Sequence, residues 1–107
     1  MSRLNKLKEF LASEPDDSFT RYALGLEYAK VQNLPEAIAT LEYLRERDPK
    51  YVPTYYMLGG YYREIGQKEM AQTIYQAGIH VAHASGDHHA SSELQSALAE
   101  LEDELEN

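Results

Sequence analysis

Residues 55–62, Tyr-Tyr-Met-Leu-Gly-Gly-Tyr-Tyr, decide the fold because they repeat the stretch at 21–28, Arg-Tyr-Ala-Leu-Gly-Leu-Glu-Tyr. The two stretches lie 34 residues apart, and the same offset relates Ala37 to Ala71 with no insertion in between. Self-similarity at this period is typical of stacked helical hairpins, because a single hairpin is too small to bury its own apolar face. Such stacks present a curved surface suited to binding, so the period favours recognition over catalysis.

Hydrophobic periodicity predicts six helices and no strands. The 107 residues are enough for one small domain with a core of its own. We expect an N-terminal half-repeat helix in residues 1–15, a first repeat at 18–51, a second repeat at 52–85 and a capping helix at 86–107.

Helix boundaries are marked by capping and turn residues. Asp17 or Ser18 is expected to cap the first helix of the first repeat. The second helix of that repeat is expected from Glu36 to about Arg47, with Pro35 in its first turn, where the missing N–H does no harm. Gly86 suits a left-handed C-terminal cap before the last helix.

Glycines inside two predicted helices indicate close helix packing, because glycine weakens an isolated helix by roughly 1 kcal/mol relative to alanine. Gly25 precedes Ala37 by twelve residues, and Gly59 precedes Ala71 by the same spacing. We expect each glycine to face its alanine, which would let the two backbones of the hairpin come close together.

The chain resembles the tetratricopeptide repeat (TPR) family over essentially its whole length. The residues that carry the resemblance are Leu24, Gly25, Tyr28, Ala37, Leu41 and Pro49 in the first repeat, and Leu58, Gly59, Tyr62, Ala71, Tyr75 and Gly78 in the second. The resemblance implies an all-α fold, namely a right-handed superhelical stack of TPR-like helix-turn-helix hairpins with a C-terminal capping helix. The pattern departs from the family at Arg21, where a large aromatic is usual, and at His83, where a closing proline is usual.

The resemblance also implies a non-enzymatic module that binds a peptide or partner surface on the concave face formed by the first helix of each repeat. The predicted groove consists of Phe19, Tyr22, Leu26, Lys30, Pro53, Tyr56, Gly60 and Arg63. Tyrosines suit such a surface because they offer rigid apolar area with a polar tip. Some family members bind acidic chaperone tails through a clamp of Lys, Asn and Arg, but the matching places here hold Tyr22, Leu26, Tyr56 and Gly60.

Other tyrosines follow the helical stripe and are predicted to pack inside the fold. They are Tyr43, Tyr51, Tyr55, Tyr61, Tyr62 and Tyr75.

Composition and charge exclude several classes of function. The net charge is -8, and residues 85–107 contribute seven acidic side chains and no Lys or Arg. A nucleic-acid binder needs a basic face to displace counterions, so we expect no nucleic-acid partner. We also expect no cofactor, no enzymatic activity, no membrane span and a cytoplasmic location, because the chain has no cysteine, no phosphate-binding loop and no long apolar run.

Two other interpretations stay open at this point. His80 and His83 share a helical face and are candidate ligands of a metal-responsive site, although no His-Glu-x-x-His motif is present. The leucines of the last helix form either a cap on the second repeat or a short coiled-coil seam that would make the chain a self-associating building block. The cap interpretation predicts a monomer with at most weak dimers at high salt.

Overall fold

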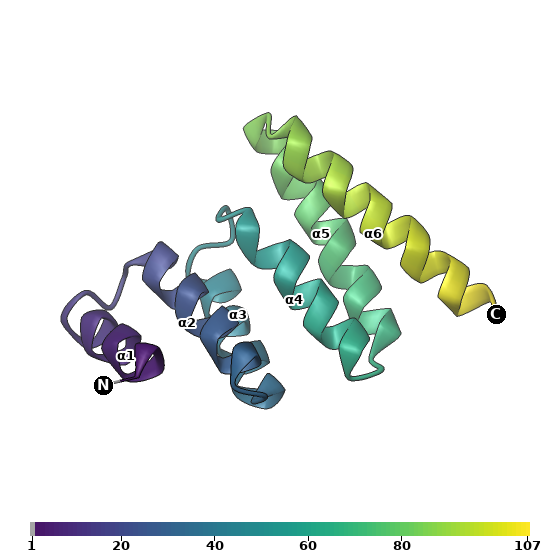
Figure 1. Ribbon diagram of the computed structural model, residues 1–107. Coiled ribbons are helices and arrows are strands. Elements are labelled where there is room, and N and C mark those ends of the chain that lie inside the picture. Colours follow the sequence, from purple (N-terminus) through teal and green to yellow (C-terminus); the bar gives the residue numbers. More distant parts are fainter. Residues whose placement is uncertain (1) are drawn as a thin grey trace. The chain divides into compact units, whose positions relative to one another are not determined.

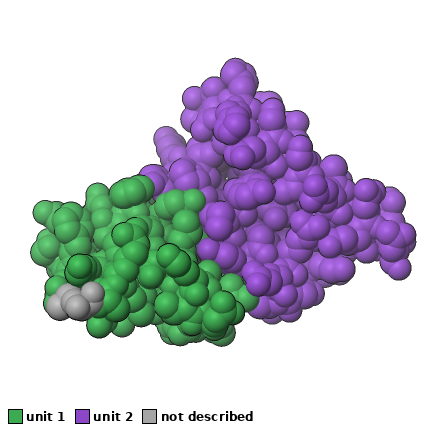
Figure 2. Space-filling model, in the orientation of Figure 1, with its two compact units in different colours: residues 1–48 green, residues 49–107 purple. Residues whose placement is uncertain are grey.

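The computed structural model describes residues 2–107, and these form six helices and no strand (Figure 1). The helices are α1 (Arg3–Ser13), α2 (Ser18–Lys30), α3 (Leu34–Arg47), α4 (Pro53–Glu64), α5 (Lys68–Ser85) and α6 (His88–Glu106). The chain divides into two compact units, residues 1–48 and 49–107 (Figure 2). The prediction of an all-α fold is confirmed.

The first unit is a helical hairpin with one further helix. α2 and α3 pack along each other, and α1 packs on α2. Ala37, Leu41 and Leu44 have at most 1% of their surface exposed, and Leu24 is buried with them. These positions recur every three or four residues along α3, as burial of one helix face requires.

The second unit repeats the hairpin with α4 and α5 and adds α6. α6 packs along α5 and also contacts α4. Leu58 of α4, Ile74 of α5, and Leu94 and Leu101 of α6 are buried together as its core, each at most 1% exposed. Leu94 and Leu101 therefore pack inside the second unit, as the cap interpretation predicted, whereas Leu98 is half-buried and Leu105 is exposed.

Side chains cap four helices at their N-termini, beginning with α1, where the hydroxyl of Ser2 accepts a hydrogen bond from the N–H of Asn5 at 3.1 Å. Asp17 accepts a hydrogen bond from the backbone N–H of Thr20 at 3.0 Å, and Asp87 accepts one from Ala90 at the same distance. Asn33 caps α3, which begins at Leu34 and not at Glu36 as the sequence predicted. Its amide oxygen accepts from the N–H of Glu36, so the helix starts where this cap allows.

A left-handed residue lies two positions after the first helix of each hairpin, and another caps α5. Gly66 and Gly86 have φ angles of 85° and 74°, and the equivalent of Gly66 in the first unit is Gln32 with φ 66°. The predicted left-handed cap at Gly86 is confirmed.

The predicted pairing of glycine with alanine is wrong in its register. A β-carbon on Gly59 would lie 2.6 Å from Cδ1 of Tyr75, and the three nearest atoms all belong to that ring. A β-carbon on Gly25 would lie 2.6 Å from Leu41, with the backbone oxygen of Ala37 further away at 3.7 Å. The contact is thus displaced by one turn along the second helix, because residues four apart lie on the same helix face.

Candidate functional site

The second unit contains a hollow with a volume of about 330 Å³ to which α4, α5 and α6 all contribute. Its lining combines aromatic, hydroxyl and charged side chains. These are Tyr56, Arg63, Tyr75, His89, Ser92, Glu93, Ser96, Ala97 and Glu100.

α4 places the two predicted groove residues of this hollow on one face. Tyr56 and Arg63 are seven residues apart, which is two helical turns, so their side chains point the same way. Tyr56 is 45% exposed, whereas Tyr75 of α5 is buried at 2%. Burial raises the pKa of the Tyr75 phenol, since the charged form would lose its hydration.

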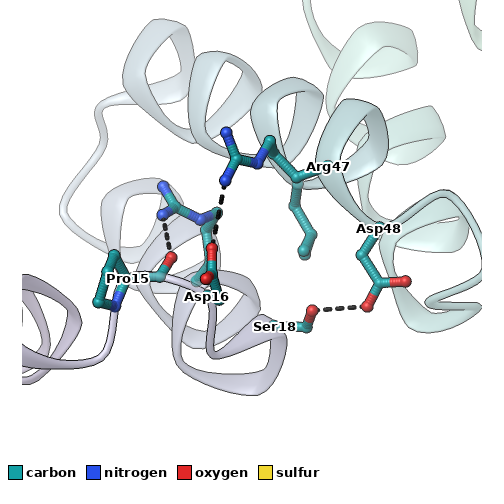
Figure 3. A pocket seen from close by; sticks show the side chains of 7 residues that line it. Pro15, Asp16, Ser18, Arg47 and Asp48 are labelled. Carbon is teal, nitrogen blue, oxygen red and sulfur yellow. Dashed lines mark hydrogen bonds and ion pairs between the residues drawn. The ribbon is translucent and has the colours of Figure 1, made fainter.

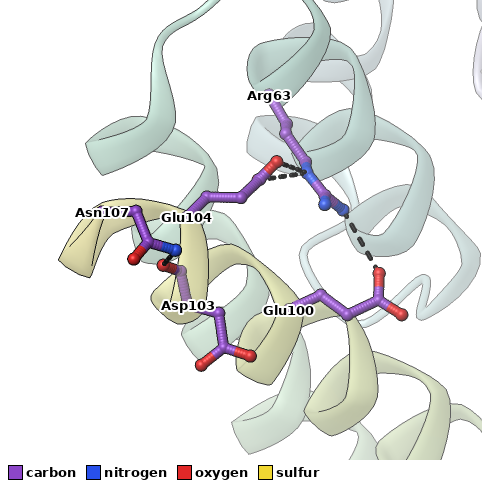
Figure 4. A network of polar contacts seen from close by, with 5 residues as sticks. All are labelled: Arg63, Glu100, Asp103, Glu104 and Asn107. Atoms are coloured by element: carbon purple, nitrogen blue, oxygen red, sulfur yellow. Dashed lines mark hydrogen bonds and ion pairs between the residues drawn. The ribbon is translucent and has the colours of Figure 1, made fainter.

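Arg63 joins α4 to α6 through two carboxylates (Figure 4). Its Nε lies 2.8 Å from Glu104 and its Nη1 lies 3.6 Å from Glu100. The hydrogen bond from Arg63 lowers the pKa of the Glu104 carboxyl, and the same bond raises the pKa of Arg63. The guanidinium of Arg63, which lines the hollow, is therefore already paired within the chain.

The other predicted groove residues are distributed over both units. Pro53 is exposed at the start of α4, and Gly60 is half-buried in the same helix. The remaining four belong to α2 of the first unit: Phe19, Tyr22, Leu26 and Lys30. Phe19 is 67% exposed, while Tyr22 and Leu26 are half-buried.

A second, more polar hollow lies in the first unit, with a volume of about 240 Å³ (Figure 3). Arg47 pairs with Asp16 at 3.2 Å, and Ser18 donates a hydrogen bond to Asp48 at 2.6 Å. Arg21 donates to the backbone oxygen of Pro15 at 2.7 Å. These polar groups already form hydrogen bonds and an ion pair with one another. Their contacts hold the segment around the start of α2 against the end of α3.

Tyr43 differs from the other tyrosines that were predicted to pack in the core. Tyr55, Tyr61, Tyr62 and Tyr75 are buried and Tyr51 is half-buried, but Tyr43 is 42% exposed, so its predicted place in the core is wrong. Its ring lies 4.3 Å from the guanidinium carbon of Arg21, a cation–π contact. Arg21 thus replaces the usual large aromatic by stacking on a tyrosine of the next helix.

The two histidines predicted as weak metal candidates lie exposed near the end of α5. His83 Nε2 is 3.3 Å from the Ser91 hydroxyl of α6, and His80 lines a mostly apolar hollow with Lys50 and Val81. Within residues 2–107, no three His, Cys, Asp or Glu side chains come together as a set that could hold a metal ion.

Comparison with known proteins shows which family this chain belongs to. A tetratricopeptide repeat domain protein from Salinibacter ruber, solved by crystallography, is 44% identical, with a TM-score of 0.78. That match covers 81% of this chain and 97% of the other. The chain belongs to the tetratricopeptide repeat family. No family model matches it.

Further relatives share the TPR fold. A TPR repeat-containing protein from Pseudomonas aeruginosa is 28% identical over 96 residues, which are 90% of this chain and 91% of that protein. The TPR2B domain of yeast Sti1, solved as a complex with pHsp70, is 18% identical with a TM-score of 0.87, over 94% of this chain and 81% of the other.

Sequence reasoning missed the contribution of α5 and α6 to the hollow of this TPR chain. Tyr75 was assigned to packing alone, and α6 was treated only as a cap. The signal was present in the spacing of Glu93, Ser96 and Glu100, which lie three and four residues apart and so follow one helix face. No helix in the part of the chain that the structure describes has the length and apolar character needed to cross a membrane.

Proposed function

We propose that this chain is a non-enzymatic protein–protein interaction module that binds a peptide or partner surface with the hollow of its second unit. The observation that carries the proposal is the exposure of Tyr56 at the rim of a concavity whose wall includes Arg63 and Tyr75. Tyrosine in a concave site is a common anchor of binding energy, because it desolvates a large rigid area with little loss of conformational entropy.

The TPR framework supports this function in general. Protein–protein interaction is what the resemblance implies for the family, and the Sti1 domain of the same fold was solved in a complex.

The test selects peptides from a displayed random library on the full chain and then measures their affinities for two matched variants. Tyr56→Ser removes the anchor in the hollow, and Tyr43→Ser removes a tyrosine of similar exposure, 42% against 45%. We expect Tyr56→Ser to weaken binding about tenfold or more, as the loss of a central aromatic does, and Tyr43→Ser to leave it unchanged.

Circular dichroism shows whether both variants keep their helices. A library that yields no binder, or binders that tolerate Tyr56→Ser in the folded protein, would refute the proposed function.

A further inference from the structure

The hollow of the second unit is lined by two carboxylates, those of Glu93 and Glu100, and by one permanent cation, Arg63. His89 also lines it, with its Nε2 3.7 Å from the Glu93 carboxylate, and this contact is an ion pair only when the imidazole is protonated. Arg63 is held by Glu100 and by Glu104, which lies one turn beyond the lining. Glu93 and Glu100 remain accessible to solvent, with 53% and 70% of their side chains exposed.

The rest of α6 reinforces this charge. α6 and its N-cap, Asp87, contain seven acidic residues and no Lys or Arg, and the last turn of the helix has no basic residue. Carboxylates near the C-terminus of a helix are opposed by the helix dipole, whose negative end lies there. A cation bound beside them would relieve this repulsion, whereas an anionic ligand would increase it.

The remaining lining fits the chemistry of a cationic side chain on an extended backbone. The exposed ring of Tyr56 offers an aromatic face on which an ammonium or guanidinium group can stack. Glu93 and Glu100 lie seven residues apart on α6, so they offer two acceptors on one face. Ser92 and Ser96 add hydroxyls, which both donate and accept hydrogen bonds and so suit peptide groups.

We propose that the occupant of this hollow is a basic peptide segment, which places a Lys or Arg side chain between Tyr56 and the carboxylates of Glu93 and Glu100. This inference rests on the proposed function and adds the charge of the partner. Charge complementarity with α6 favours this occupant over an acidic or an uncharged segment.

The experiment uses three synthetic peptide libraries of equal length, enriched in Lys and Arg, in Asp and Glu, or in uncharged residues. Each is titrated against the full chain and against two double variants. Glu93→Gln with Glu100→Gln removes the carboxylates of the hollow. Glu102→Gln with Glu106→Gln removes the same charge from exposed positions of the same helix that do not line the hollow.

We expect the basic library to bind best, and its affinity to fall about tenfold or more in the first variant but less than threefold in the second, since local contacts exceed long-range attraction. Equal losses in both variants would overturn the inference, because they would reflect only the overall field of the helix.

Failure of the inference is distinguishable from failure of the proposed function. If acidic or uncharged peptides bind best and lose affinity in Tyr56→Ser, the hollow is a peptide site but its partner is not basic. If no library binds, both are refuted.

Discussion

The ring of Tyr75 lies directly against the backbone of Gly59, where a β-carbon would come within 2.6 Å of Cδ1. The neighbouring Gly60 is different, because the nearest atom to a β-carbon there is the Tyr75 hydroxyl at 3.9 Å. One tyrosine therefore requires a glycine at one position of α4 and permits a larger residue at the next. The same ring forms part of the wall of the hollow, so hairpin packing and the candidate site share a residue.

This difference predicts opposite effects for two adjacent substitutions. Gly59→Ala should destabilise the fold by ~1–3 kcal/mol, because the buried ring of Tyr75 has to move. Gly60→Ala should stabilise it by up to ~1 kcal/mol, the helix preference of alanine over glycine. Chemical denaturation of the two variants checks both signs. Equal effects would mean that the Tyr75 ring does not limit how closely α4 approaches α5.

A matched pair of threonines provides a second prediction. The hydroxyl of Thr54 is fully buried with no hydrogen-bond partner among residues 2–107, whereas that of Thr20 pairs with Asp17. Thr54→Val keeps the shape and removes an unsatisfied polar group, so we expect neutral to stabilising behaviour, up to ~1 kcal/mol. Thr20→Val should instead cost about 1 kcal/mol by the loss of its hydrogen bond. Thermal unfolding of both variants is the measurement. A clearly destabilising Thr54→Val would mean that the Thr54 hydroxyl does have a hydrogen-bond partner.

The left-handed residue Gln32 provides a third prediction. Its φ of 66° is strained for a side chain with a β-carbon, and the second repeat has Gly66 at the same place. Gln32→Gly should therefore stabilise the chain by about 0.5–1 kcal/mol, after allowance for the greater freedom of glycine in the unfolded state. Gly66→Ala should destabilise it. Urea melts measure both, and a loss of stability in Gln32→Gly would show that the side chain contributes more than the strain costs.

The ion pair between Arg63 and Glu104 gives stability a dependence on pH. The pKa of Glu104 is lower in the folded chain than in the unfolded one, so folding favours the ionised carboxyl. Its stabilising effect is complete above the ordinary glutamate pKa of about 4.3 and is lost as pH falls through the lower folded value. Glu104→Gln should therefore lower Tm slightly at neutral pH, and its difference from wild type should shrink in acid, as the pH falls below about 4.3.

Glu106→Gln, an exposed change at the end of α6, is the control and should leave Tm unchanged at both pH values. A difference between wild type and Glu104→Gln that persists in acid would contradict the ion-pair explanation.

The buried leucines of α6 predict the oligomeric state. Leu101 has no exposed surface, whereas Leu105 is 37% exposed. Leu101→Lys should cost roughly 3 kcal/mol or more, because a charge would be buried in the core of the second unit, and Leu105→Lys should have little effect. Sedimentation equilibrium should give a monomer for wild type at physiological salt. A wild-type dimer that Leu101→Lys converts into a folded monomer would instead identify α6 as a seam.

The helices could be predicted from sequence because their causes are local. Each signal depends only on residues that are close in the sequence. Examples are the capping side chain of Asp17, the left-handed Gly86 and the leucine spacing of α6. Tyr56 and Arg63 were expected in a groove from the family resemblance, and their common helix face follows from their spacing of seven residues.

The contacts that depend on helix register could not be predicted in the same way. Which turn of α5 meets Gly59 is set by the geometry of the loop and by the bulk of both helices. The partner of Arg63 is 41 residues away in the chain, and nothing in the spacing of α6 distinguishes Glu104 from the other acidic residues around it.

The two repeats have different residue pairs at equivalent positions of their two helices. Tyr55 faces Gly78 in the second repeat, where a β-carbon would lie 2.5 Å from the Tyr55 Cβ, and the equivalent residues of the first are Arg21 and Leu44. A genetic crossover between the helices of a repeat would join Tyr55 to a leucine, which does not fit, or Arg21 to a glycine, which leaves a void. Rearrangements of this gene are therefore expected to keep each helical pair together, so that the unit of inheritance is the whole hairpin and not the single helix.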